Sequence, residues 1–212
     1  MTTQAKFRIP FLRTTLGKEE KKAISDVIDS GWVVMGKKTE EFEQKFAEYV
    51  GAKHAVFVDS GTAALFLATR YVKEFLHAHF LQVPSLTFTA TAEVVINNGI
   101  ELRFKDVRKD NLTLDTELHF SIGVHLMGNK CEAPSVIYDS AHRIERNDVK
   151  DSDSIWCYSF YATKNLTTIQ GGMIVCNKKE VADWVRKGGD HGISKGTQER
   201  YENGEWEYSV DF

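Results

Sequence analysis

The sequence predicts an α/β protein with a mixed, mainly parallel sheet and flanking helices, and two observations lead to this fold class. Short runs rich in Val and Ile alternate along the chain with longer segments whose apolar residues recur at helical spacing. The short runs are continuously apolar, as expected for strands that helices cover on both faces. With 212 residues, of which 42% are hydrophobic, the chain is long enough to bury one sizeable core.

Two helices are predicted before the first strand. Residues 17–30 carry Ala, Ile and Val side chains at helical spacing, and Gly31 follows where a helix commonly ends. Thr39 is a suitable N-cap for the second helix, because glutamates follow it in the first turn, where they favour the helix dipole. Gly51 stands where the C-terminal glycine of this helix is expected.

Strands and helices then alternate as far as residue 187. Strands are predicted at residues 55–58, 81–83, 102–104, 122–125, 136–138, 155–158 and 173–176, and helices at residues 62–80, 89–96 and 179–187. From Gly188 onward the sequence is polar and glycine-rich. We therefore expect one domain over residues 1–187, with an N-terminal helical arm, and a loop or linker over residues 188–212.

One predicted connection is unusually short. Parallel neighbours in a sheet normally need a crossover of about a dozen or more residues, and residues 128–135 are fewer than that. Either the protein has an abbreviated outer helix layer, or the strands on the two sides are not neighbours in the sheet. The first alternative is favoured.

Composition and charge exclude several function classes. The formal net charge of -3 gives no electrostatic reason to expect nucleic acid or an anionic membrane as partner. Cys131, Cys157 and Cys176 are widely spaced and odd in number, so we expect reduced thiols and neither a disulfide framework nor a metal site. No apolar run reaches the roughly 18–20 residues of a membrane span. A cytoplasmic protein is expected.

A candidate phosphate site follows the first strand. Gly61 permits a close turn, and the backbone amides of Gly61, Thr62 and Ala63 would lie at a helix N-terminus, where unpaired N–H groups and the helix dipole favour an anion. The competing interpretation is ordinary helix capping, which many strand-to-helix turns use.

Two further candidates stand at strand ends. Phe88 opens a helix after a strand, where ligands bind in open α/β folds, and could stack on a planar heterocycle; alternatively it is a core residue. Asp139 ends an apolar strand and is either a functional acid or a cap. His142, just beyond it, is in isolation an ordinary, partly buried histidine.

Lys164 is the most informative candidate. It lies in a turn rich in Ser, Thr and Gly between two apolar strands, a position with few structural uses for a lysine. A solvated loop lysine remains the alternative from this pattern alone.

Taken together, these segments resemble the DegT/StrS-type sugar aminotransferases, a branch of the aspartate-aminotransferase-like enzymes that use pyridoxal phosphate (PLP). The resemblance runs from Ile9 to the end of the chain. It rests on SGW at 30–32, SGTAAL at 60–65, PSLTFTATAE at 84–93, VHLMG at 124–128, YDSAH at 138–142 and SFYATKNLTT at 159–168.

The resemblance implies a role for each candidate. It implies that the fold is the large PLP-binding domain of this enzyme class and that Lys164 forms a Schiff base with the cofactor. The remaining roles are phosphate binding by Gly61, Thr62 and Ser159, ring stacking by Phe88, pairing of Asp139 with the ring nitrogen, and contact of His142 with the ring hydroxyl.

The implied activity is transfer of an amino group, from a donor such as glutamate, to a keto sugar nucleotide. Some relatives carry histidine at the position of Lys164 and perform dehydration, so the lysine favours transamination. The alternative is a truncated remnant that binds PLP with little or no turnover. A nucleotide- or DNA-binding regulator has little support, because the sequence has no Walker-type loop and no basic stripe.

The resemblance also implies a homodimer and a small C-terminal domain that is missing here. The apolar loop Trp32, Val33 and Val34 is expected near the dimer-side active site. The chain ends within a segment that reaches the partner's cofactor phosphate in the family. Asparagine is common there near the position of Asp211, and a carboxylate would repel phosphate, so no role is assigned to Asp211.

Overall fold

The computed structural model describes residues 13–193, 197–204 and 209–210, and Asp211 therefore lies outside the described residues. The chain divides into two units, residues 1–34 and residues 35–212. In the first unit, helix α1 (Lys18–Ser30) begins with the backbone N–H of Gly17 donating to the Glu20 carboxylate at 2.6 Å. It ends at Gly31 in the left-handed conformation, with φ 73°, as the sequence predicts.

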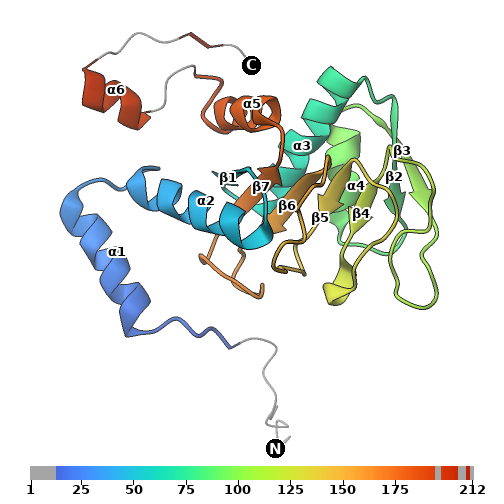
Figure 1. The fold of residues 1–212 in the computed structure, drawn as a ribbon, viewed down its shortest axis with the longest axis horizontal. Helices are drawn as coiled ribbons and strands as arrows, with labels where there is room; N and C mark the ends of the chain where they lie inside the picture. The colour runs from blue at the N-terminus through green and yellow to red at the C-terminus, as the bar shows by residue number, and fades with distance from the viewer. Residues whose placement is uncertain (1–12, 194–196, 205–208, 211–212) are drawn as a thin grey trace, which may run out of the picture. The chain divides into compact units, whose positions relative to one another are not determined.

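The second unit is built on a five-stranded sheet in the order β1-β7-β6-β5-β4 (Figure 1). Among these strands only β7 runs antiparallel to its neighbours. A parallel pair, β2-β3, joins the β4 edge through a bridge between Gln82 and Ser121. The strands are β1 (His54–Val58), β2 (Phe80–Pro84), β3 (Glu101–Lys105), β4 (Ile122–Val124), β5 (Ile137–Asp139), β6 (Ile155–Ser159) and β7 (Gly172–Cys176).

Helices cover both faces of this sheet and create two apolar cores. Helices α3 and α5 pack on one face and α2 packs against β1 on the other. Alternate residues of β6 pack into the two cores. Ile155 and Cys157 lie in the core that includes α3, whereas Trp156 and Tyr158 lie in the core under α2. The helices are α2 (Lys37–Val50), α3 (Gly61–Leu76), α4 (Thr89–Asn97), α5 (Lys179–Gly189) and α6 (Thr197–Asn203).

The short connection between β4 and β5 contains no α-helix. These strands are parallel neighbours, joined by a 3-10 turn, η1 (Leu126–Gly128), and an extended loop. The first alternative, an abbreviated outer layer, is therefore correct. On the face of the sheet that carries the α2 core, the rings of His125, Tyr138 and Trp156 pack together with centroid separations of 4.5–5.2 Å, and those of His125 and Tyr138 are nearly parallel.

Most predicted strand and helix ends differ from the observed ones by one or two residues, and the largest differences concern α2, α3 and the C-terminal segment. Helix α2 begins at Lys37, with Gly36 as its N-cap, and not at Thr39. Helix α3 ends at Leu76, well before residue 80, because His77 takes the left-handed conformation and caps it. The segment expected to be loop, residues 188–212, contains α6. No helix among the described residues is both long and apolar enough to cross a bilayer.

Candidate functional site

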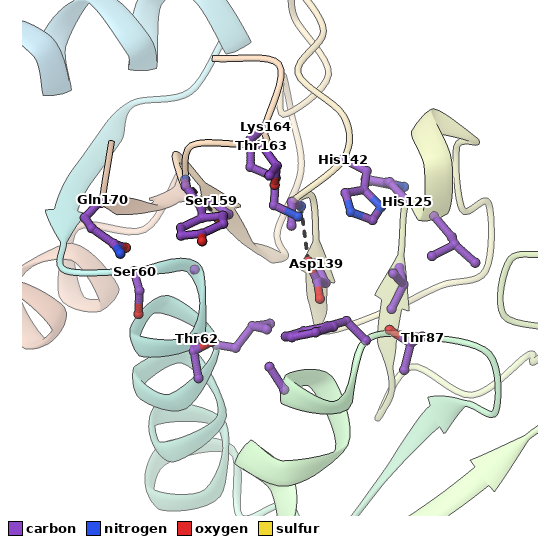
Figure 2. A pocket seen from close by; sticks show the side chains of 18 residues that line it. Ser60, Thr62, Thr87, His125, Asp139, His142, Ser159, Thr163, Lys164 and Gln170 are labelled. Atoms are coloured by element: carbon purple, nitrogen blue, oxygen red, sulfur yellow. Dashed lines mark hydrogen bonds between the residues drawn. The ribbon is translucent and has the colours of Figure 1, made fainter. Parts of the chain in front are cut away.

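A cavity of about 430 Å³ opens where β4, β5 and β6 end and where helix α3 begins (Figure 2). The carboxyl ends of parallel strands commonly meet a helix N-terminus at such an edge, and ligands bind there. Side chains from separate loops converge on it. Its lining residues are Ser60, Gly61, Thr62, Leu65, Thr87, Phe88, Ala90, Val124, His125, Leu126, Asp139, Ala141, His142, Ser159, Tyr161, Thr163, Lys164 and Gln170.

The N-terminus of α3 is brought close to β6 by a glycine. A Cβ atom at Gly61 would lie 2.8 Å from the Ser159 Cβ, a distance that side chains do not tolerate. The Ser60 hydroxyl caps the helix by accepting from the Ala63 N–H at 3.1 Å. Gly61, Thr62 and Ser159 line the cavity. Ala63 does not line it, and its amide already donates to the Ser60 hydroxyl.

Asp139 is a buried carboxylate at the end of β5. Its Oδ1 accepts from the Ala141 N–H at 3.1 Å, drawn as a dashed line in Figure 2, and its Oδ2 accepts from the Thr91 hydroxyl at 2.9 Å. Burial raises the pKa of this carboxyl, against the opposing influence of its hydrogen bonds, His142 and Lys164. Asp139 forms no ion pair with any described residue. A cationic ligand would supply the missing partner.

Lys164 lies in the loop between β6 and β7. Its amine is partly buried, and burial lowers its pKa, while Asp139 acts in the opposite direction. The loop is braced on both sides of the lysine: Lys164 N–H donates to the Tyr161 carbonyl at 2.9 Å, and the Thr167 hydroxyl donates to the Phe160 carbonyl at 3.0 Å. A lysine with a lowered pKa on a braced loop is suited to act as a nucleophile or a base.

His142 extends into the cavity beside Lys164 and Asp139 (Figure 2). Its Nδ1 accepts a hydrogen bond from the Met127 N–H at 3.3 Å. Burial and the nearby Lys164 lower the pKa of His142. The ring is then neutral at pH 7, and its proton is on Nε2, where it can be donated to a ligand.

Phe88 is not a core residue. It precedes α4 as the N-cap, lines the cavity, and remains 70% exposed. An aromatic ring held at a cavity mouth with one face in solvent has a free surface on which a planar ligand can stack. The alternative of a core role for Phe88 is therefore wrong.

The structure brings seven of the eight predicted site residues together, and Ala63 is the exception. The sequence prediction missed Thr87, Thr91, Tyr161 and Gln170. Thr87 precedes the predicted helix and Thr91 lies in its first turn, so their spacing gave no signal of a shared role. Their partner, Asp139, is remote in sequence and could not be identified from spacing.

Comparison with known proteins finds similar sequences and similar folds. SpsC of Bacillus subtilis (strain 168), a spore coat polysaccharide biosynthesis protein, is 34% identical to this chain in an alignment of 228 positions that covers 96% of this chain and 58% of SpsC. The PLP form of Streptococcus pneumoniae Spr1654 has a TM-score of 0.80 at 24% identity, covering 97% of this chain and 62% of Spr1654. This chain thus spans about three fifths of the length of these relatives.

A further solved structure with the same fold is that of ColD, a GDP-4-keto-6-deoxymannose-3-dehydratase, in a mutant form with bound GDP-perosamine. It matches with a TM-score of 0.75 at 22% identity, over 89% of this chain and 56% of ColD. The family model of the DegT/DnrJ/EryC1/StrS aminotransferases matches residues 14–209, which is almost the whole sequence. The chain belongs to the DegT/DnrJ/EryC1/StrS aminotransferase family.

Proposed function

We propose that the cavity binds PLP and that the protein transfers an amino group to a keto sugar nucleotide. The observation that carries this proposal is the composition of one cavity. It combines a buried carboxylate without a cationic partner among the described residues, a lysine with a lowered pKa, and a helix N-terminus opened by glycine. These three features match the ring nitrogen, the aldehyde and the phosphate of PLP.

Each side chain has a task that follows from its position. The Asp139 carboxylate pairs with the protonated ring nitrogen, and the neutral His142 donates its Nε2 proton to the ring hydroxyl. Phe88 stacks on the ring. The backbone amides of Gly61 and Thr62, with the hydroxyls of Thr62 and Ser159, bind the phosphate at the positive end of α3.

PLP, when bound, supplies an electron-withdrawing ring that stabilises negative charge on the substrate carbon. Lys164 would hold the cofactor covalently through its amine. Its free amine, once released by an amino donor, would be placed to move a proton between the donor carbon and the cofactor carbon across the nitrogen. A lowered pKa favours this role, because more of the amine is then unprotonated near neutral pH.

The substrate class rests on the relatives. The family is one of aminotransferases, and ColD has the same fold and binds a GDP sugar. Lys164 favours amino transfer over the dehydration performed by relatives that carry histidine at this position. We further propose that glutamate donates the amino group and that the protein acts in the cytoplasm.

Self-association belongs to the same proposal. Large apolar side chains are exposed on the three loops that line the cavity, and water is a poor partner for them. A second copy of the chain would cover them and close the cavity mouth. They are Leu86, Phe88, Met127, Tyr161, Leu166 and Ile169.

The proposal is tested with Asp139→Asn, which keeps the shape of the side chain but removes its charge. The rate at which bound PLP accepts the amino group of glutamate should fall by at least about 100-fold, while PLP affinity falls far less, because the charge matters most when the carbanion forms. Equal rates for the variant and the wild type would show that Asp139 is only a strand-end cap. Binding of PLP without any reaction with glutamate in the wild type would favour a protein that binds the cofactor without turnover.

A further inference from the structure

We propose that the hydroxyls of Thr87 and Thr91 form a positioning chain that holds the Asp139 carboxylate ionised and aimed into the cavity. This inference rests on the proposed function, because the two hydroxyls would keep Asp139 charged for pairing with a cationic ring nitrogen. Neither threonine is assigned a role by the family resemblance stated above.

The geometry consists of two short hydrogen bonds in sequence. Thr91, fully buried in the first turn of α4, donates from Oγ1 to Asp139 Oδ2 at 2.9 Å. Thr87, in the loop before α4, has its Oγ1 2.9 Å from the same Thr91 oxygen and lines the cavity. The two hydrogen bonds therefore connect the cavity wall to the buried carboxylate.

The direction of both bonds follows from proton counting. An ionised carboxylate has no proton to give, so the Thr91 hydroxyl must donate its single proton to Asp139. Thr91 then has only lone pairs left for Thr87, and Thr87 must donate to Thr91. Both dipoles point their positive ends toward Asp139, and each bond strengthens the other in a buried site.

The groups around Asp139 explain why this support matters. Burial disfavours its charge, and the thiol of Cys157, its cross-strand neighbour on β6, is fully buried and neutral. The Ala141 N–H occupies Oδ1. Lys164 and the protonated form of His142 favour the carboxylate, but the pKa of His142 is lowered and its ring is neutral near pH 7. Lys164 gives up its proton when it acts as a base, and the Thr91 bond remains.

A purely structural role for Thr91 is the competing explanation. Its hydroxyl could serve only to attach α4 to the sheet, in which case its loss would lower stability without altering the ionisation of Asp139. The two explanations differ in the titration of Asp139, and this titration can be measured without any cofactor.

The experiment uses cofactor-free protein labelled with ¹³C at the aspartate carboxyl carbon, with the Asp139 signal assigned by its absence in Asp139→Asn. Thr91→Val removes the hydroxyl at nearly constant volume, and Thr91→Ser keeps it. Loss of one hydrogen bond to a charged group should move the Asp139 titration midpoint upward by about one pH unit in Thr91→Val. Thr91→Ser should titrate like the wild type, and Thr87→Val should show a smaller upward shift.

A second measurement, the PLP dissociation constant, tests whether the threonine hydroxyls affect cofactor binding. At pH 7 the PLP dissociation constant of Thr91→Val should rise about tenfold, with Thr91→Ser near the wild-type value. An unchanged Asp139 midpoint in folded Thr91→Val would overturn the inference. If Thr91→Val does not fold, an unchanged midpoint in Thr87→Val overturns it instead. Failure of the wild type to bind PLP would contradict the proposed function, whereas the titration would still decide whether the threonine chain acts on Asp139.

Discussion

At the scale of single residues, His125 shows how the abbreviated outer layer fixes an ionisation state. The ring is fully buried against Tyr138 and Trp156, and its Nδ1 accepts from the Cys131 N–H at 2.9 Å. Burial lowers the pKa of His125 to about 4. The neutral imidazole is thus part of the core, and the protonated form is incompatible with it.

This predicts an acid-sensitive fold. The unfolded chain binds a proton at His125 near pH 6.5, whereas the folded chain does so only near pH 4. The contribution of the neutral ring to the free energy of unfolding is therefore complete above about pH 6.5. It is lost as the pH falls toward 4, because the unfolded state then takes up the proton first. The expected loss through this group is on the order of 3 kcal/mol. Urea unfolding at several pH values measures it.

His125→Phe is the matched control for the acid sensitivity. Phenylalanine keeps the aromatic stacking but cannot take up a proton. The variant should be less stable at pH 7, because the buried Cys131 N–H loses its acceptor, and it should show a shallower fall in stability between pH 6.5 and 4. An identical pH dependence in the variant and the wild type would rule out His125 as the cause.

The sequence identifies residues whose chemistry is unusual for their local pattern, and it misses residues that act through distant partners. Lys164 in a Ser/Thr-rich turn and Asp139 at a strand end could both be selected as candidates from the sequence, and the resemblance implied their roles. Thr91 was not selected, because a threonine at a helix start has an ordinary capping role. Its importance depends on Asp139, which the fold brings within 2.9 Å.

At the scale of elements, the loop between β6 and β7 combines Lys164, the proposed cofactor-binding lysine, with backbone strain. Ile169 has φ 72°, in the left-handed region that β-branched residues avoid. The Thr167 hydroxyl accepts from the Ile169 N–H at 2.8 Å, and the Thr168 hydroxyl donates to the Gln170 carbonyl at 2.6 Å. These bonds hold the turn in a conformation that its own side chain disfavours.

Replacing Ile169 with glycine should therefore stabilise the protein. Relief of about 1–2 kcal/mol of left-handed strain outweighs the larger entropy of glycine in the unfolded chain, for a net gain of about 0.5–1 kcal/mol. Leu166→Gly, in the same loop but without a positive φ, is the control and should destabilise the protein. Thermal unfolding of both variants measures the difference. A loss of stability in both would mean that Ile169 is not strained.

Element boundaries were predictable where a local signal ended the element. Gly31 and Gly51 end their helices in the left-handed conformation, as the sequence indicates. Helix α3 was predicted too long because the apolar sequence continues beyond Leu76, and the helix is ended by His77, a residue with no strong preference for that role. The strand order was not predictable from spacing, because register and pairing depend on contacts between remote segments.

At the scale of the whole molecule, exposed apolar side chains predict self-association. Val33 and Val34 are 69% and 57% exposed, and Leu166 is exposed beside the cavity. Val34→Glu and Leu166→Glu should each weaken a homodimer by at least about tenfold in dissociation constant, because burying an unpaired charge at an interface is costly. Phe104→Glu, on the edge strand β3, is the control of similar exposure and should leave association unchanged. Analytical ultracentrifugation with PLP present measures the three variants, and a wild type that stays monomeric at high concentration would contradict the prediction.

Covalent trapping tests whether the cavity binds PLP through Lys164. Purified protein is mixed with PLP, reduced with borohydride and digested, and the modified peptide is identified by mass spectrometry. We expect one PLP group on the peptide that contains Lys164, visible absorbance before reduction, and loss of both in Lys164→Ala with the fold intact. Modification of a different lysine, or none at all in folded wild-type protein, would contradict this expectation.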